Sequence, residues 1–327
     1  MTERRYFWSI VLGIFFVMVV LTAVIWMIPL DRYMDNEFAS WQQQKDYVHR
    51  PGTEQEVLFL GDSVFKAAVL PEEISPQAYN LALGGATPLE MYYSLRDYLV
   101  VHPAPRAVFL SFSPVHYMDM ESYHTRNFYF HFLGGRDALA SQLFVFRKDG
   151  TPWRERPGLL VWDAAYLART PMMYYRTIRE SKLARDDGNR KEYERVAEAR
   201  GHKFFGFADD WVASYQTYEV FLRPFVPLES LHGYLVAMIR LCQARGVPVF
   251  VLQDPMQPLD YAVISQSGYL AAYEAFMDRV AEETGVPVER EIPVFDVSFF
   301  GDFQHVNLRG AMRYSHWVRA RYGEVLQ

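Results

Sequence analysis

The chain alternates between short apolar runs and longer segments with helical spacing. Because the runs are apolar on both faces and end in turn residues, they predict the strands of a mainly parallel sheet covered by helices on both sides. This is the doubly wound α/β class. The five runs are 56–63 (EVLFLGDS), 78–85 (AYNLALGG), 107–114 (AVFLSFSP), 247–255 (VPVFVLQDP) and 292–298 (IPVFDVS). The intervening helices are predicted at 88–101, 228–246, 268–285 and 307–323.

The N-terminus has a different pattern. From Trp8 to Leu30 no residue is charged, and about 20 apolar residues suffice for a helix to cross a bilayer. Residues 1–30 are therefore predicted to be a cytoplasmic tip and membrane anchor, with a cleaved signal peptide as the alternative. Arg4 and Arg5 precede the run and acidic residues follow it, so the N-terminus is predicted to be cytoplasmic and the remainder extracytoplasmic, which is periplasmic in a Gram-negative cell.

Three further regions follow the anchor. Residues 31–54 are polar and are predicted to be a stalk, and residues 55–327 are predicted to form the main domain. The regular alternation fails between residues 115 and 228, which are rich in aromatic residues and arginine. This stretch is predicted to be an insertion after the third strand. It could be a lid with its own small core or a cap that binds substrate.

Composition excludes several classes of function. Half of the 327 residues are hydrophobic and the formal charge is −6, so the chain can build a large core but lacks the basic excess of a nucleic-acid-binding protein. Cys242 is the sole cysteine, which excludes an intramolecular disulfide and a cysteine-rich zinc site. The sequence predicts neither a metal site nor a cofactor.

A serine follows the first predicted strand in the stretch Gly61-Asp62-Ser63. Ligands of an open parallel sheet bind at the carboxyl ends of its strands, so this serine lies where a nucleophile would be useful. A serine hydroxyl needs a histidine to remove its proton and an acid to orient that histidine. The alternative is a tight turn with a helix N-cap, a common role of Asp and Ser.

The candidate base and acid are His305 and Asp302, between the last predicted strand and the last predicted helix. At this spacing the carboxylate can accept a hydrogen bond from the imidazole and leave its other nitrogen free to face Ser63. The spacing alone decides nothing, because it recurs at Asp46/His49, Glu121/His124 and Glu229/His232. The position next to the final strand distinguishes the C-terminal pair. His102, His116, His124, His131 and His316 are expected to be structural or surface residues.

The second run contributes a glycine turn. Asn80 precedes Gly84-Gly85, and Thr87 follows. Backbone N–H groups at such a turn can approach a developing oxyanion because no Cβ is in the way. An ordinary turn into the helix at Pro88 is the alternative.

Together, GDS, NLALGGAT and DFQH resemble the three motifs of the SGNH, or GDSL-type, hydrolase superfamily, in the order found in that family. The resemblance implies a flavodoxin-like three-layer α/β/α fold with five strands. It also implies that Ser63 is the nucleophile, His305 the general base and Asp302 its orienting acid. Gly85 and Ser63 would supply amides to the oxyanion hole, and Asp62, Asn80 and Thr87 could contact substrate.

One block departs from the family pattern. The family strand usually ends in Gly-x-Asn-Asp, whose asparagine donates to the oxyanion, whereas here it ends in FLSFSPVHY. Ser113 occupies the approximate place of that asparagine, and Asn127 is an outside candidate. Losing one such donor typically costs about 10²–10³ in turnover.

The anchored architecture looks most like the SGNH branch of the alginate-acetylation proteins and the D-alanyl-transfer protein DltD. That resemblance implies transfer of an acyl group, of acetyl or D-alanyl type, to a hydroxyl of a cell-envelope polysaccharide or related polymer. A membrane-bound O-acyltransferase would be the partner that supplies the acyl group. Two alternatives stay open: an extracytoplasmic esterase or deacetylase that uses the same residues, and a catalytically weak scaffold that binds polymer.

Overall fold

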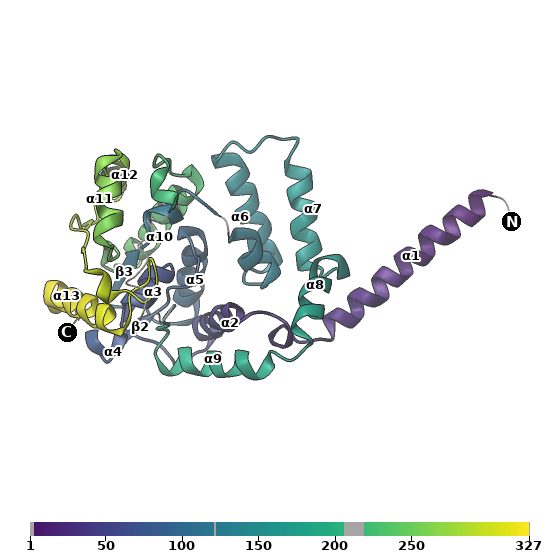
Figure 1. The fold of residues 1–327 in the computed structure, drawn as a ribbon, viewed down its shortest axis with the longest axis horizontal. Coiled ribbons are helices and arrows are strands. Elements are labelled where there is room, and N and C mark those ends of the chain that lie inside the picture. Colours follow the sequence, from purple (N-terminus) through teal and green to yellow (C-terminus); the bar gives the residue numbers. More distant parts are fainter. Residues whose placement is uncertain (1–2, 121, 206–218, 327) are drawn as a thin grey trace. The chain divides into compact units, whose positions relative to one another are not determined.

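The structure is a computed structural model that describes residues 3–120, 122–205 and 219–326 (Figure 1). These residues form two compact units. Unit 1 contains the described residues up to Ala39 and the segment Tyr123–Tyr193. Unit 2 contains Ser40–Ser122 and the described residues from Glu194 onward. The predicted insertion, 115–228, is thus divided between the two units, and its residues 206–218 lie outside the described part.

Unit 2 is built on a parallel sheet in the order β2-β1-β3-β4. The strands are β1 Val57–Gly61, β2 Ala78–Asn80, β3 Ala107–Ser111 and β4 Val249–Val251. Every residue of β1, β2 and β3 is buried, as a strand that is covered on both faces requires. The α/β class with a parallel sheet is therefore confirmed.

The fifth predicted strand does not form in the described part of the chain, so the sheet has four strands rather than five. The predicted segment makes one isolated parallel bridge instead, Met256 to Val294, and a second such bridge, Val251 to Val288, lies just before it. Pro287 and Pro293 lie directly before the two bridging valines. A proline has no N–H to donate to a ladder, so continuous pairing is interrupted there.

Helices cover both faces of this sheet. Phe59 and Phe109 stack at a centroid distance of 5.0 Å and belong to a buried cluster with α3, α4 and α13. Side chains alternate along a strand, so Leu58 and Leu110 point to the opposite face, where α5 contacts β1 and α10 contacts β4. The bounds are α3 Ser63–Ala68, α4 Pro71–Ile74, α5 Pro88–Val101, α10 Glu229–Gln243 and α13 Leu308–Leu326.

The shorter elements of unit 2 complete these layers. The helix α12 packs against both α10 and α11. Three short 3₁₀ turns also lie among the described residues of this unit. The bounds are η2 Pro114–Tyr117, η5 Glu219–Leu222, α11 Pro258–Gln266, α12 Tyr269–Thr284 and η6 Val297–Phe299.

Unit 1 is helical in its described residues. Its core surrounds Tyr174, whose ring packs edge to face on Tyr33 and whose hydroxyl donates to the carbonyl of Tyr166 at 2.9 Å. The elements are α1 Glu3–Trp26, η1 Leu30–Arg32, the π-helical turn η3 His124–Tyr129, α6 Gly135–Lys148, α7 Arg156–Leu167, α8 Pro171–Ser181 and the first turns of α9 Asp186–Glu198.

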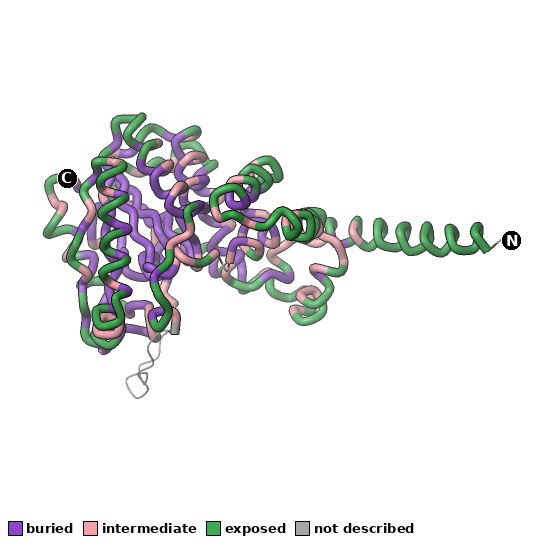
Figure 2. Tube along the Cα trace, turned by 90° about the horizontal axis from the view of Figure 1, so that it is seen from above, coloured by how far each residue is buried: buried purple, intermediate pink, exposed green. Residues whose placement is uncertain are grey.

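The helix α1 confirms an N-terminal segment that is long and apolar enough to cross a membrane. Its side chains are exposed along nearly the whole helix, with Ile25 as its buried member (Figure 2). Large apolar side chains exposed in this way are energetically unfavourable in water. The cytoplasmic placement of the N-terminus stays a prediction.

The predicted stalk contains a helix, α2 Asn36–His49. From Ser40 onward it belongs to unit 2, where Tyr47 stacks on Tyr79 at 3.7 Å and Gln43 donates to the Tyr79 hydroxyl at 2.7 Å. The polar side chain of Gln43 is thus buried and hydrogen-bonded within unit 2. Residues 40–49 are therefore a packed part of unit 2.

Candidate functional site

Ser63 is positioned by the junction between β1 and α3. Asp62 follows the strand and caps the helix, because its Oδ1 accepts hydrogen bonds from the amides of Val64 at 2.8 Å and Phe65 at 3.2 Å. Ser63 is therefore the first residue of α3, with a side chain at the carboxyl end of the sheet. A Cβ on Gly61 would lie 2.0 Å from the Ser111 carbonyl oxygen, so the close approach of β1 and β3 at this point requires glycine.

Ser63, His305 and Asp302 lie in one hydrogen-bonded row, although the serine and the acid are 239 positions apart in the sequence. His305 Nδ1 is 2.7 Å from Asp302 Oδ2, and His305 Nε2 is 2.8 Å from Ser63 Oγ. Since a carboxylate only accepts, Nδ1 carries the proton of the neutral imidazole and the Ser63 hydroxyl donates to Nε2. This is the tautomer that can take a proton from the serine.

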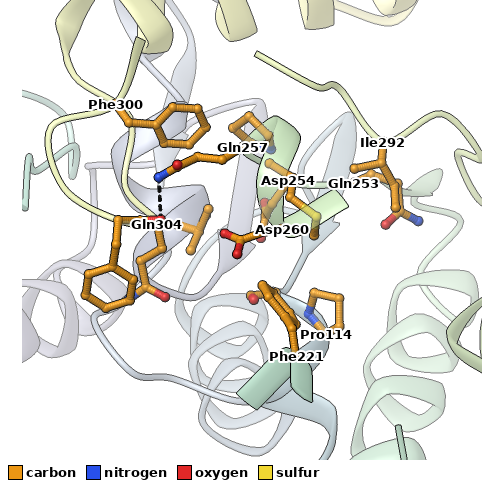
Figure 3. Close-up of a pocket in the computed structure, with 14 residues that line it drawn as sticks. Pro114, Phe221, Gln253, Asp254, Gln257, Asp260, Ile292, Phe300 and Gln304 are labelled. Carbon is orange, nitrogen blue, oxygen red and sulfur yellow. Dashed lines mark hydrogen bonds between the residues drawn. The ribbon is translucent and has the colours of Figure 1, made fainter. Parts of the chain in front are cut away.

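The loop that carries His305 is fixed from two sides. The second carboxylate oxygen of Asp302 accepts hydrogen bonds from the amides of Gln304 at 2.9 Å and His305 at 2.7 Å. Gln257 donates through Nε2 to the Phe303 carbonyl at 2.6 Å (Figure 3). Asp302 thus shapes the loop and orients the imidazole at the same time.

The charge state of Asp302 suits this role. Burial opposes its ionisation, but hydrogen bonds from His305 and from the backbone outweigh burial and lower the pKa of the carboxyl below its usual range. Asp302 is therefore a carboxylate at neutral pH. An anionic oxygen next to Nδ1 stabilises the imidazolium that would form when His305 accepts a proton.

Ser63 and Gly85 carry the two backbone amides that are predicted to form the oxyanion hole. Within the described residues, the N–H groups of Ser63 and Gly85 donate to no protein acceptor. Gly85 has a φ of +68°, and its carbonyl accepts a hydrogen bond from the Ser122 hydroxyl. The left-handed conformation is one that glycine adopts without strain.

The amide of Ser113 is already engaged, because it donates to Asp62 Oδ2 at 2.7 Å. Ser113 is the predicted third donor of the oxyanion hole. Because its amide is engaged, its hydroxyl is the group that can still donate to a ligand. Ser113 is buried and lines a cavity beside Val64.

The other predicted contact residues have structural partners. Asn80 is buried, and its side-chain amide donates to the carbonyls of Lys66 at 3.1 Å and Val69 at 3.0 Å. Thr87 caps α5 in a capping box with Glu90. Asn127 lies in η3 of unit 1. The structure thus gives Asn80 and Thr87 bracing roles, and substrate contact by these three residues stays a prediction.

Sequence reasoning gave His116 no role at the site, yet the structure pairs it with Asp62. His116 Nδ1 is 2.5 Å from Asp62 Oδ2. Burial works against the protonated ring, but the charge and hydrogen bond of Asp62 overcome it and raise the pKa of His116. One feature of the sequence could have indicated a role for His116: it lies three residues after Ser113, in the block that departs from the family pattern.

A second residue that sequence reasoning missed is Phe205, whose ring stacks on the His305 imidazole at a centroid distance of 4.8 Å. The preceding backbone is held tightly against β2, because Gly201 has a φ of +88° and a Cβ there would lie 1.9 Å from the Asn80 carbonyl oxygen. The Lys203 ammonium lies 5.0 Å from the centre of the Phe205 ring. An apolar ring therefore covers one face of the imidazole.

A small cavity adjoins the site. Its volume of about 30 Å³ exceeds the roughly 10–15 Å³ that one water molecule needs. Asp254 and Asp260 face it from one side and Phe221 and Pro114 from another (Figure 3). Burial and the charge of Asp62 raise the pKa of Asp254 well above its usual range, which favours the neutral form of this carboxyl.

Asp254 also has an open hydrogen-bonding position. Its Oδ1 accepts from the Ser111 hydroxyl at 2.7 Å, while Oδ2 is buried and has no hydrogen-bond partner among the described residues. A neutral carboxyl can donate a hydrogen bond as well as accept one. The cavity can therefore bind a polar group as well as an apolar one.

Three or more metal-binding side chains do not gather at any point in the described ranges. The chemistry supported by this geometry is nucleophilic attack by Ser63 with proton transfer to His305.

A family model that carries no description matches residues 222–327. No curated protein matches the sequence. A crystal structure from Bacteroides fragilis NCTC 9343, described as "a putative acylhydrolase", matches with 12% identity and a TM-score of 0.39, over 88% of this chain and 96% of that chain.

Proposed function

We propose that the chain is an SGNH-type serine acyltransferase, with Ser63 as nucleophile, His305 as general base and Asp302 as the orienting acid. The observation that carries the proposal is the continuous row of hydrogen bonds from Asp302 through His305 to the Ser63 hydroxyl, at 2.7 and 2.8 Å. A general base must lie within hydrogen-bond reach of the proton that it removes. This imidazole lies at that distance in the required tautomer.

The reaction has two half-steps. Ser63 Oγ attacks the carbonyl carbon of an acyl donor while its proton passes to His305 Nε2, and the departing oxygen or sulfur of the donor then takes that proton. In the second half-step an acceptor hydroxyl gives its proton to His305 and attacks the acyl-serine, and His305 then returns that proton to the departing Ser63 Oγ. The free amides of Ser63 and Gly85 would stabilise both oxyanions.

The proposed acyl group is of acetyl or D-alanyl type, and the proposed acceptor is a hydroxyl of a cell-envelope polysaccharide or related polymer outside the cytoplasm. The helix α1 supports this setting, because it can hold the enzyme at a membrane. A membrane-bound O-acyltransferase is the proposed partner that supplies the acyl group. The Phe205 ring on His305 favours transfer over hydrolysis, since it covers the base with an apolar surface.

The engaged Ser113 amide favours one alternative, a scaffold with weak catalysis that binds the polymer. An esterase would use the same residues as the transferase, with water as acceptor. The identity of the acceptor, water or a polymer hydroxyl, therefore distinguishes an esterase from a transferase. Formation of an acyl-enzyme distinguishes either enzyme from a scaffold.

The test is intact-mass spectrometry of the full chain in detergent after incubation with p-nitrophenyl acetate, with p-nitrophenol release followed in parallel. Wild type and Ser63→Ala are compared. We expect an acetyl adduct in the wild type that is absent from the variant. An adduct that persists in water and is discharged by an added glycan supports the transferase, and rapid loss to water supports the esterase. Equal signals from both proteins would refute the proposal.

A further inference from the structure

The end of α1 is attached to the connection between α7 and α8. Trp26 donates through Nε1 to the Ala168 carbonyl at 2.8 Å. The guanidinium of Arg169 lies 4.4 Å from the centre of the Trp26 ring and also donates to the Ile28 carbonyl at 3.5 Å. Tryptophan at the end of a membrane-spanning helix lies at the level of the lipid headgroups. If α1 spans a bilayer, Ala168 and Arg169 therefore lie at that level too.

The helix α8, which is next to the base of α1 in Figure 1, has two different faces. Tyr174 points into the core of unit 1 and is fully buried. Met172, Tyr175, Arg176 and Arg179 share the opposite face by their spacing along the helix. Met172 and Tyr175 are 71% and 63% exposed. The outer face of α8 thus combines an apolar residue and an aromatic residue with two arginines.

Exposed aromatic and apolar residues continue along α7 and the segment before it. Trp153 is 72% exposed, Val161 69% and Trp162 52%. We call Trp153, Val161, Trp162, Met172, Tyr175, Arg176 and Arg179 the α7–α8 surface. Isolated exposed apolar residues are common, but a group of this size on two neighbouring helices is typical of a surface that is covered in use.

The charge of this region is opposite to that of the chain. Residues 151–185 contain seven Lys or Arg residues and three Asp or Glu residues, whereas the whole chain has a formal charge of −6. One of the three acids, Asp163, is buried and paired with His124. The accessible charge of residues 151–185 is therefore predominantly positive, although Arg176 is paired with Glu180 at 2.9 Å.

We propose that the α7–α8 surface of unit 1 lies on the lipid headgroups of the membrane that α1 spans. Three features favour a lipid surface over a protein partner: continuity with the end of α1, tryptophan and tyrosine beside arginine, and a local positive charge that matches phosphate headgroups. Unit 1 would then contact the membrane at two places, through α1 in the bilayer and through the α7–α8 surface on the headgroups.

The test measures contact with lipid directly and does not depend on enzymatic activity. The full chain is reconstituted into nanodiscs of phosphatidylcholine and phosphatidylglycerol, with a fluorophore attached to a single introduced cysteine. Cys242 is fully buried and stays in place, with unlabelled wild type as the check on its reactivity. Three positions are compared: Met27→Cys at the end of α1, Met172→Cys on the α7–α8 surface and Lys191→Cys on the exposed side of α9. Quenching by brominated lipid is recorded for each.

The proposal expects the label at position 172 to be quenched to a similar extent as that at 27 and to show a blue-shifted emission, with little quenching at 191. Adding Arg176→Glu and Arg179→Glu to Met172→Cys should reduce quenching at 172 while a label at 27 stays quenched, which shows that α1 is still inserted. Equal, low quenching at 172 and 191 would overturn the proposal. So would shielding at 172 that requires a co-purified membrane protein.

Discussion

His116 donates a hydrogen bond of 2.5 Å through Nδ1 to Oδ2 of Asp62, the residue directly before Ser63. The same oxygen accepts the amide of Ser113 at 2.7 Å, and the other oxygen of Asp62 caps α3. One buried carboxylate therefore joins η2 to the first turn of α3. This arrangement fixes the backbone that carries the candidate nucleophile.

His116→Gln should destabilise the protein more at low pH than at high pH. The pair with Asp62 raises the pKa of His116, and Glu90 and Asp119 add to the negative field around it. A raised pKa gives a stabilising contribution that is complete below the unfolded value of about 6.5 and is lost as pH rises through the folded value. We expect a loss of about 1.5–3 kcal/mol near pH 6, typical of a hydrogen bond to a charged group.

Thermal unfolding of the full chain in detergent at several pH values checks this prediction. His316→Gln is the control, because His316 pairs with Glu73 at an exposed position, where ion pairs contribute little. A deficit for His116→Gln that is constant with pH, or grows at alkaline pH, would show that the ring is neutral in the folded protein.

Asp302→Asn should lower the rate of acyl-enzyme formation by about 10⁴, because the amide can favour the wrong tautomer of His305. The matched control is Asp296→Asn, since Asp296 also caps a turn by accepting a backbone amide, that of Ser298 at 3.0 Å. If both substitutions reduce the rate equally, Asp302 acts through its loop and does not orient the imidazole. Burst kinetics with p-nitrophenyl acetate distinguish the two outcomes.

The lowered pKa of Asp302 adds a prediction about acid stability. A carboxyl with a depressed pKa stabilises the fold above its unfolded value of about 3.9 and loses this contribution as pH falls through the folded value. The stability difference between wild type and Asp302→Asn should therefore be full near neutral pH and shrink on acidification. A difference that increases below about pH 4 would contradict the assigned ionisation. Unfolding midpoints across this range provide the measurement.

The sequence predicted those parts of the site that depend on local order along the chain. An apolar run followed by Gly61-Asp62-Ser63 indicated both a buried strand and its end, and the position of His305 between the last strand and last helix indicated a loop at the same edge of the sheet. Parallel strands bring such loops together whatever their separation in sequence. The structure accordingly places His305 against Ser63.

The features that were missed depend on tertiary contacts. Residues 292–298 are as apolar as the other runs, but pairing along them is limited to the isolated bridge at Val294. His116 looked like a surface histidine because its partner Asp62 is 54 residues away. Phe205 was one aromatic residue among many, and its stacking on His305 follows from the Gly201 turn that packs against Asn80.

Phe205→Ala should slow acyl-enzyme formation and increase the share of acyl-enzyme lost to water. Stacked aromatic pairs contribute about 0.5–1.5 kcal/mol beyond their buried area, which corresponds to roughly a two- to tenfold change in rate. Phe205→Leu keeps an apolar side chain over His305 but has no ring to stack on it. Compared with Phe205→Ala, it should restore the partition between transfer and hydrolysis more fully than it restores the rate of acyl-enzyme formation. Phe204→Ala is the control, since the Phe204 ring contacts His202. Identical partition in all variants would exclude a covering role.

Gly61→Ala should destabilise unit 2 and reduce acylation of Ser63 together. The added Cβ would lie 2.0 Å from the Ser111 carbonyl oxygen and within 2.9 Å of the Phe65 side chain, so β1 and β3 must separate where they position Asp62. Overpacking of this kind typically costs about 1–3 kcal/mol. Gly158→Ala is the matched control, because a Cβ in α7 meets nothing within 4 Å, and alanine is favoured over glycine in a helix by about 1 kcal/mol. Opposite shifts of the two unfolding midpoints are expected. Equal shifts would mean that the strands do not meet as closely as the structure shows.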